Sequence, residues 1–274
     1  MSRLSDSERP LLRVRAAAVS YRADRPALRD VSFDLEPAGS LGICGESGSG
    51  KSTLLRALLG LVPLSSGEVC WRGRSLADLR AAQWQALRRT VQPVFQDPLA
   101  SLDPRMRVGE LLAEPLRVHE GRAGRATQAS RVAGMLARIG LSTAVLSRYP
   151  HELSGGQCQR VCIARAMLLE PAVLACDEAV SALDVSIQAQ IIGLLRTLNR
   201  DAGTALIFVS HNLAVLRRLC SRLIVLRAGT VVECGPTEAV IAGPQHAYTR
   251  QLVAAVPPLP RRREAAGGAW LISR

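Results

Sequence analysis

Short apolar runs rich in β-branched residues recur along the chain, and each predicts a strand. Between several of them, apolar residues recur every three or four positions, as on one face of a helix. The strand-like runs are 11–21, 31–35, 40–44, 68–71, 91–95, 172–176, 205–209, 222–226 and 230–234. The helix-like segments are 51–61, 80–89, 125–140, 155–169, 185–200 and 211–220. Uninterrupted apolar strands alternating with helices are typical of a parallel sheet covered on both faces. The early strands, with few helices between them, predict a smaller antiparallel layer.

The pattern changes twice along the chain. Strand signals vanish over 97–154, where helical periodicity takes over, which predicts a helical insertion. The flanking segments 1–96 and 155–235 then form the core domain. From 236 to 274 we expect a loop, one helix and a flexible tail rich in Pro, Gly and Arg.

Composition excludes some classes of protein and leaves others open. The chain has 274 residues and 48% hydrophobic residues, but no apolar run approaches the ~20 residues of a membrane-spanning helix. No apolar stretch follows the charged first ten residues, so we expect a soluble protein of the cytosol. The net charge of +12 raises the possibility of nucleic-acid binding. Because the basic residues after 215 are mostly scattered and lack interleaved aromatics, we expect a solvated or lipid-facing surface and no nucleic-acid partner.

Residues 45–52, GESGSGKS, match the phosphate-binding loop G-x-x-x-x-G-K-[ST] between a strand and a helix. Glycines let successive backbone N–H groups point at phosphate oxygens, and the helix N-terminus adds partial positive charge. Lys51, the single lysine among 35 basic residues, would reach the terminal phosphates, while Ser52 would bind Mg²⁺. The predicted ATP-binding residues of this loop are Gly45, Glu46, Ser47, Gly48, Ser49, Gly50, Lys51, Ser52 and Thr53.

A pair of carboxylates supplies the second half of a nucleotide-hydrolysing site. Asp177 and Glu178 directly follow the buried strand 172–176. Asp177 is predicted to hold Mg²⁺ through water, and Glu178 to orient and deprotonate the attacking water.

A second glycine-rich element is the motif LSGGQ at 153–157, at the start of a predicted helix. Ser154 can cap that helix, but capping does not explain two glycines in its first turn, where each destabilises it. With this motif, the sequence resembles the ATP-binding subunits of ABC transporters over nearly its whole length. The resemblance implies an α/β fold: a P-loop NTPase core with a mainly parallel sheet, a small antiparallel β subdomain and an inserted helical subdomain.

The resemblance also implies how two chains build one site. Two subunits face head to tail, and the signature motif of each closes over the ATP of its partner. The signature residues are Leu153, Ser154, Gly155, Gly156 and Gln157.

Further positions acquire roles only through the resemblance. Tyr21 would stack on adenine, and Asp184 would contact the opposite subunit. Gln96 would sense Mg²⁺ and water, joining Ser52 and Asp177 as a metal-site residue. His211 would touch the γ-phosphate, so the predicted catalytic residues are Glu178, His211 and Gln96.

Two segments, VFQDPLASLDPR at 94–105 and QHAYTRQLVAAVP at 245–257, resemble the oligopeptide, dipeptide and nickel uptake group. This implies the ATP-hydrolysing subunit of a bacterial importer, peripheral on the cytoplasmic face of the inner membrane. Its partners would be a second ATP-binding subunit, two membrane permeases and an external substrate-binding protein. The choice between peptide and nickel or metallophore, and between identical and non-identical subunits, stays open. So does the alternative of a non-transport ABC ATPase acting on nucleic acid or ribosomes, which only the charge favours.

Overall fold

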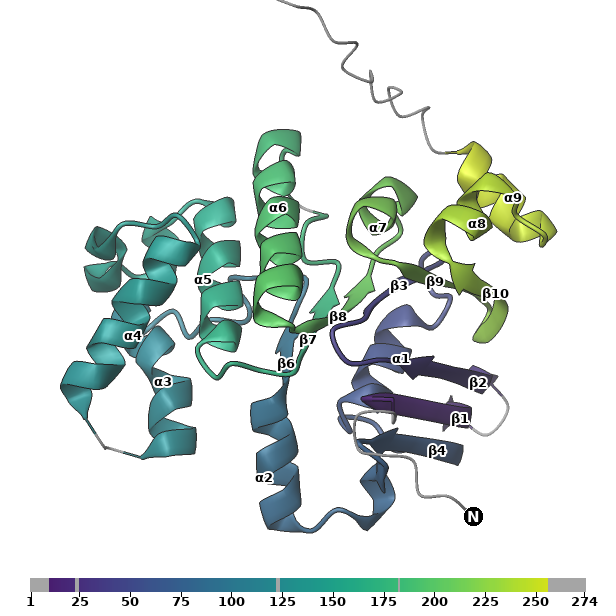
Figure 1. Cartoon of the computed structure of the whole chain (residues 1–274), viewed down its shortest axis with the longest axis horizontal. Coiled ribbons are helices and arrows are strands. Elements are labelled where there is room, and N and C mark those ends of the chain that lie inside the picture. Colours follow the sequence, from purple (N-terminus) through teal and green to yellow (C-terminus); the bar gives the residue numbers. More distant parts are fainter. Residues whose placement is uncertain (1–9, 23–24, 122–123, 182, 256–274) are drawn as a thin grey trace, which may run out of the picture.

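A computed structural model of the chain describes residues 10–22, 25–121, 124–181 and 183–255. Two sheets and the helices around them make up this part (Figure 1). The tail predicted to be flexible, from 256 onward, lies outside the described residues. Among the described residues, no helix has both the length and the apolar character that crossing a membrane requires.

The larger sheet has the strand order β10-β9-β3-β8-β7-β6. All neighbouring strands from β9 to β6 run parallel, and β10 pairs antiparallel with β9 at the edge. Every residue of β3, β7 and β8 is buried, as expected for central strands covered on both faces. The strands are β3 (Ser40–Cys44), β6 (Val91–Val94), β7 (Val173–Asp177), β8 (Ala205–Val209), β9 (Arg222–Arg227) and β10 (Thr230–Pro236).

The smaller sheet is antiparallel, with the order β2-β1-β4-β5. Its strands are β1 (Leu12–Arg22), β2 (Arg25–Leu35), β4 (Ser66–Trp71) and β5 (Arg74–Ser75). A mainly parallel sheet beside a small antiparallel one confirms the α/β fold class that the sequence predicts.

Helices connect most of the strands. They are α1 (Lys51–Leu58), α2 (Ala81–Thr90), α3 (Val108–Glu120), α4 (Arg125–Arg138), α5 (Gly155–Met167), α6 (Val185–Ala202), α7 (Leu213–Leu219), α8 (Thr237–Ala242) and α9 (Ala247–Ala254). Short 3₁₀ turns are η2 (Leu76–Asp78), η3 (Thr143–Ser147) and η4 (Pro150–Glu152). Between β6 and β7 the chain forms α3, α4, η3, η4 and α5. The division into core, insertion and C-terminal extension itself stays a prediction.

The helix α3 lies inside 97–154, where the sequence predicts helical periodicity, although no separate helix was delimited over its residues. It contains Pro115, which removes one backbone hydrogen bond. Its apolar face nevertheless buries Leu111, Leu112 and Leu116. After β10 the described chain forms two helices, α8 and α9, where the sequence predicts one. Gly243 and Pro244 separate them.

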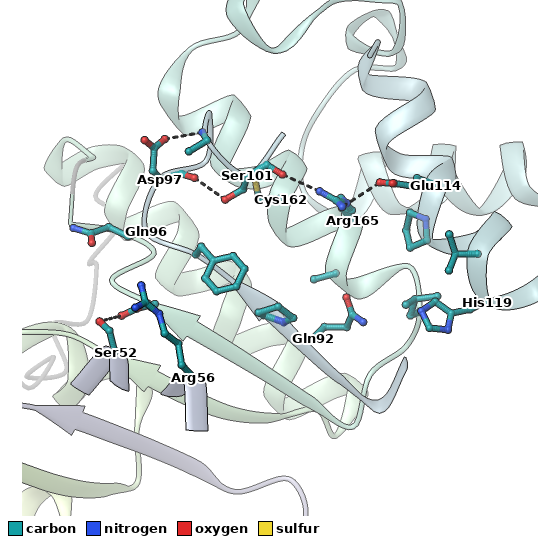
Figure 2. A pocket seen from close by; sticks show the side chains of 18 residues that line it. Ser52, Arg56, Gln92, Gln96, Asp97, Ser101, Glu114, His119, Cys162 and Arg165 are labelled. Carbon is teal, nitrogen blue, oxygen red and sulfur yellow. Dashed lines mark hydrogen bonds and ion pairs between the residues drawn. The ribbon is translucent and has the colours of Figure 1, made fainter. Parts of the chain in front are cut away.

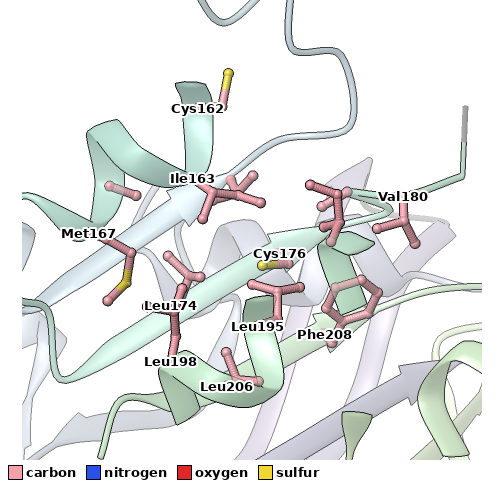
Figure 3. Close-up of a cluster of buried hydrophobic side chains, with 14 of the residues drawn as sticks. Cys162, Ile163, Met167, Leu174, Cys176, Val180, Leu195, Leu198, Leu206 and Phe208 are labelled. Carbon is pink, nitrogen blue, oxygen red and sulfur yellow. The ribbon is translucent and has the colours of Figure 1, made fainter. Parts of the chain in front are cut away.

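Alternate side chains of the central strands enter two different cores. Val173 and Ala175 of β7 pack with α1 and the antiparallel sheet. Leu174 and Cys176 of the same strand pack with α5 and α6, where Phe208 of β8 joins them (Figure 3). This alternation follows from the two-residue repeat of a strand. The helices α1 and α5 therefore lie on opposite faces of the large sheet (Figure 1).

Candidate active site

The loop between β3 and α1 wraps around a small space, and glycines allow it to do so. Gly48 and Gly50 have φ angles of 78° and 105°, which side chains rarely tolerate. A Cβ atom on Gly50 would lie 2.8 Å from the carbonyl oxygen of Ala27 in β2. Next to Ala27, the backbone N–H of Gly229 donates to the carbonyl of Ser49 at 2.9 Å. The loop is thus held from outside, with Glu46, Ser47 and Gly48 exposed and Ser49 buried.

Lys51 lies inside this loop. Its Nζ donates hydrogen bonds to the carbonyl oxygens of Gly45 and Glu46, at 2.9 and 2.8 Å. Burial lowers the pKa of this ammonium, while the carboxylates of Glu178 and Asp177 act in the opposite direction. A positive charge at the N-terminus of α1 is suited to an anionic ligand.

Ser52 and Asp177 come together although 125 positions separate them. The Ser52 hydroxyl, in the first turn of α1, donates to Oδ1 of Asp177 at the end of β7, at 3.2 Å. Burial raises the pKa of Asp177, and the hydrogen bond from Ser52 opposes that effect. A hydroxyl and a carboxylate at this distance are the hard oxygen ligands that Mg²⁺ prefers, so the residues present fit that ion.

The carboxylate of Glu178 contacts two side chains that follow the neighbouring strands β6 and β8. Its Oε1 lies 3.1 Å from Nδ1 of His211, and its Oε2 accepts a hydrogen bond from Nε2 of Gln96 at 3.2 Å. Its own backbone has φ of 46°, and its N–H donates to the carbonyl of Val209 at 3.0 Å. Gln96, Glu178 and His211 follow β6, β7 and β8, so the carboxyl ends of three adjacent parallel strands assemble the group.

A cavity of about 670 Å³ extends from Ser52, Gln96 and Asp177 to α3. Figure 2 shows Ser52, Arg56 and Gln96 at one end of it and Glu114 and His119 at the other. The ion pair between Arg165 of α5 and Glu114 of α3, at 3.1 Å, lies along its wall.

Sequence reasoning missed Arg56, which lines this cavity beside Ser52 and Asp177. Its positive charge acts to lower the pKa of Asp177, against the larger effect of burial. The available signal was its spacing: Arg56 lies four positions after Ser52, on the same face of α1.

Tyr21 lies beside the end of the phosphate loop. Its hydroxyl is 3.5 Å from Oγ1 of Thr53, and 59% of the residue is exposed. An exposed ring next to the first turn of α1 is accessible to a flat aromatic ligand.

The motif at 153–157 starts α5, as predicted, but on the sheet face opposite to α1. Ser154 Oγ accepts a hydrogen bond from the N–H of Gln157 at 3.3 Å, and Gln157 Oε1 accepts one from the N–H of Ser154 at 3.0 Å. Leu153 packs against the core. Among the described residues, no hydrogen bond in the structure joins this motif to the phosphate loop of its own chain.

The two glycines of the motif have different surroundings. No atom lies within 4 Å of a Cβ atom added to Gly155, whereas one added to Gly156 would lie 2.6 Å from Cγ2 of Ile187. Asp184 caps the adjacent helix α6 by accepting a hydrogen bond from the N–H of Ile187 at 2.9 Å. The carboxylate of Asp184 therefore has a local structural role, and the residue is exposed.

Fold and site together define an ATPase of the P-loop class built around two glycine-rich motifs. The chain belongs to the ABC transporter family, whose pattern matches residues 28–181.

Two curated relatives cover most of the chain. It is 48% identical over 231 residues to the oligopeptide transport ATP-binding protein OppF of Haemophilus influenzae, covering 84% of this chain and 70% of that protein. It is 54% identical over 231 residues to the glutathione import ATP-binding protein GsiA of Escherichia coli. This second match covers 84% of the chain but 37% of GsiA. Similarity to these transport subunits does not favour the alternative of an ATPase that acts on nucleic acid or ribosomes.

Solved structures share the fold. One is cbiO1 from Clostridium perfringens, part of the ABC transporter complex cbiONQ, with a TM-score of 0.77 and 26% identity, covering 86% of this chain and 92% of that one. Another is the ATP-binding cassette MJ0796 in a dimeric post-hydrolysis state bound to ADP and Pi, with a TM-score of 0.76 and 29% identity. That match covers 82% of this chain and 98% of MJ0796.

Proposed function

We propose that this chain is the ATP-hydrolysing motor subunit of a bacterial importer for peptides or for nickel and other metal chelates. The names of the relatives, oligopeptide transport and glutathione import, support a peptide-like substrate. The segment 245–257, which resembles this uptake group, supports the wider choice that includes metal chelates. The subunit would lie on the cytoplasmic face of the plasma membrane.

In this proposal the phosphate loop binds ATP. Lys51 leaves its carbonyl partners to meet the terminal phosphates, and the loop N–H groups hold the remaining phosphate oxygens. Tyr21 provides the platform for adenine. Ser52, Asp177 and Gln96, which line the same cavity, would hold Mg²⁺. Bound there, Mg²⁺ would neutralise negative charge that develops on the phosphate oxygens.

Glu178 acts as the general base. The observation that carries this assignment is that both of its carboxylate oxygens are held, one by Gln96 and the other beside His211. Each carboxylate oxygen has two lone pairs, so it can still accept the proton of an attacking water. His211, of which 58% of the side chain is exposed, can turn its other ring nitrogen towards the γ-phosphate.

The site is completed by a second ATP-binding subunit. Because α5 begins on the sheet face opposite to α1 and Ser154 and Gly155 are exposed, this end of the signature motif is accessible to a partner chain. The exposed Asp184, next to Val185 with 81% exposure, adds a contact surface beside them. The homologous partner would face this subunit head to tail.

Two membrane permeases would dock on the helical segment between β6 and β7. Phe95 and Val118 line the same cavity as Gln96 and are 38% and 62% exposed. Exposed apolar side chains around a cavity are typical of a protein-binding surface. Gln96 then connects the docked permease to the general base, and the permeases bring in substrate from an external binding protein.

A genetic uptake experiment tests this function. In a strain lacking the gene, uptake of labelled peptides or of Ni²⁺ should fall to background and return with the wild-type chain but not with Lys51→Ala. Loss of one uptake activity identifies the substrate. Normal uptake of both in the deletion strain would contradict the importer assignment.

A further inference from the structure

Tyr248 of α9 reaches the phosphate loop from the C-terminal end of the described chain. It lies outside residues 28–181, which the family pattern matches, and inside the segment 245–257. Only 5% of Tyr248 is exposed. Its hydroxyl oxygen accepts a hydrogen bond from the backbone N–H of Glu46 at 2.7 Å, across 202 positions of sequence.

The same peptide group also binds the phosphate-loop lysine. The N–H of Glu46 and the carbonyl of Gly45 belong to one peptide unit, and that carbonyl accepts a hydrogen bond from Nζ of Lys51 at 2.9 Å. A peptide unit is planar, so rotating it moves both groups together. Gly45, with φ of 151°, leaves this unit free of side-chain constraint. The orientation of the carbonyl that holds Lys51 is therefore coupled to the hydroxyl of Tyr248.

Other elements fix the position of Tyr248 itself. The guanidinium of Arg227, at the end of β9, lies 5.0 Å from the centre of its ring. The carboxylate of Glu233 in β10 accepts hydrogen bonds from the N–H groups of Gln245 and His246, at 2.9 and 3.0 Å, just before α9. Burial raises the pKa of Tyr248, so its hydroxyl stays neutral at physiological pH. The tyrosine is thus positioned by β9 and β10.

We propose that Tyr248 is a positioning residue of the phosphate loop. It orients the Gly45–Glu46 peptide so that Lys51 is ready for the phosphates of ATP, and it links the segment after β10 to nucleotide affinity. This inference rests on the proposed role of the loop in ATP binding. It gives the segment 245–257 a function that does not require contact with substrate or permease.

The first experiment compares full-length wild type with Tyr248→Phe, which keeps the ring and removes only the hydroxyl. Without nucleotide, the Glu46 amide should exchange its hydrogen about 10-fold faster, because its acceptor is gone. The Kd for ATP should rise about 3- to 10-fold, the effect of one hydrogen bond. The matched control is Tyr149→Phe, which removes a hydroxyl from the segment preceding α5 and should change neither quantity.

A second pair of variants tests the anchoring of α9. Glu233→Gln replaces one of the two acceptor oxygens, so it should raise the Kd for ATP in the same direction as Tyr248→Phe. Because both act through one path, the double variant should show less than the product of the two effects. If the Kd for ATP of the double variant rises by the full product of the two single effects, the two residues act independently, and the coupling through α9 is wrong.

The thermal stability of Tyr248→Phe and the ATP affinity of Lys51→Ala distinguish the other outcomes. If Tyr248→Phe lowers the thermal midpoint while leaving the Kd and the Glu46 exchange rate unchanged, Tyr248 is only a packing residue and the proposal is wrong. Lys51→Ala is measured in the same series. If Lys51→Ala binds ATP as well as wild type, the role of the loop itself fails. If Tyr248→Phe binds ATP as well as wild type but Lys51→Ala does not, the role of the loop in ATP binding stands and the positioning role of Tyr248 fails.

Discussion

Gly156 of α5 packs so closely against Ile187 of α6 that an added Cβ atom would lie 2.6 Å from Cγ2 of Ile187. The small size of Gly156 is thus explained by contact between two helices of the same chain. Gly155 differs, because a Cβ atom there would meet no atom within 4 Å. Of the two glycines, Gly155 is the one at which a substitution probes a partner subunit without disturbing the fold.

A carboxylate at Gly155 should therefore prevent closure of two subunits around ATP. Asp at a helix N-terminus is locally favourable, so Gly155→Asp should fold normally. In a closed pair it would face the phosphates of the partner's ATP, and like charges 4 Å apart repel by about 4 kcal/mol at an effective dielectric constant of 20. Gly155→Asn has nearly the same shape without the charge. ATP-dependent dimers measured by size exclusion in a Glu178→Gln background should be lost with Asp and largely kept with Asn.

The monomer provides the counter-test. Binding of ATP by an isolated Gly155→Asp subunit should equal that of the wild type, because α5 and α1 lie on opposite sheet faces. Loss of ATP binding in the monomer would mean that the signature serves its own site, and the head-to-tail arrangement would be wrong.

Gly156→Ala should instead destabilise the chain. The added methyl group must displace Ile187 or move α5, which typically lowers the free energy of unfolding by about 1–3 kcal/mol. The thermal midpoint should fall by about 2–10 °C. Gly155→Ala, measured beside it, should show no comparable loss. Equal thermal midpoints for the two alanine variants would contradict this prediction, because they would show that Ile187 can move to accommodate the added methyl group without loss of stability.

The sequence predicts the phosphate loop and the carboxylate pair because each is a contiguous strand–loop segment. Lys51 and Ser52 follow β3 within eight positions, and Asp177 ends β7, so local pattern alone places them at the carboxyl ends of parallel strands. The parallel sheet then brings Ser52 and Asp177 to 3.2 Å. The roles assigned to Tyr21, Gln96, Asp184 and His211 rest on resemblance, and they stay predictions.

Other features depend on contacts that no local pattern reveals. The bond between Tyr248 and Glu46 spans 202 positions and has no periodic signature. The contact of Gly156 with Ile187 likewise requires the three-dimensional arrangement of two helices.

Replacing the general base should separate binding from hydrolysis. Glu178→Gln keeps the shape of the side chain and can still bond to Gln96 or His211 through one oxygen, so ATP should bind with nearly unchanged affinity. Turnover should fall by about 10²- to 10⁴-fold, the usual contribution of general-base catalysis. Phosphate release and ATP affinity are measured on the same preparation. Hydrolysis within a few-fold of wild type would place the base elsewhere.

Removing the ring of Tyr21 should weaken the binding of ATP without slowing the hydrolysis of ATP that is bound. Base–aromatic stacking contributes about 1–3 kcal/mol by alanine substitution, so Tyr21→Ala should raise the KM for ATP about 5- to 150-fold. Since the ring lies beside Thr53 and not at the Glu178 cluster, kcat should change little. Tyr21→Trp should restore the affinity. A lower kcat with an unchanged KM would contradict the stacking role.

The buried carboxylate of Asp177 should destabilise the nucleotide-free fold in a pH-dependent way. Burial raises its pKa above the ordinary value of 3.8, so the folded chain binds a proton more tightly than the unfolded chain does. As pH rises from 3.8 through the raised pKa, stability therefore falls, and the full penalty is present at neutral pH.

Asp177→Asn removes this penalty and keeps an oxygen that can accept a hydrogen bond from Ser52. The hydrogen bond from Ser52 opposes the effect of burial, so the gain should be about 1 kcal/mol or less and the thermal midpoint at pH 7 should rise by up to about 2–4 °C. The difference in thermal midpoint between Asp177→Asn and wild type should shrink as the pH falls towards 3.8. The variant should also lose Mg²⁺-dependent binding of ATP. Unfolding curves recorded without nucleotide across that pH range provide the measurement. A variant less stable than wild type at pH 7 would show that the charge of Asp177 is stabilised by its neighbours more than burial penalises it.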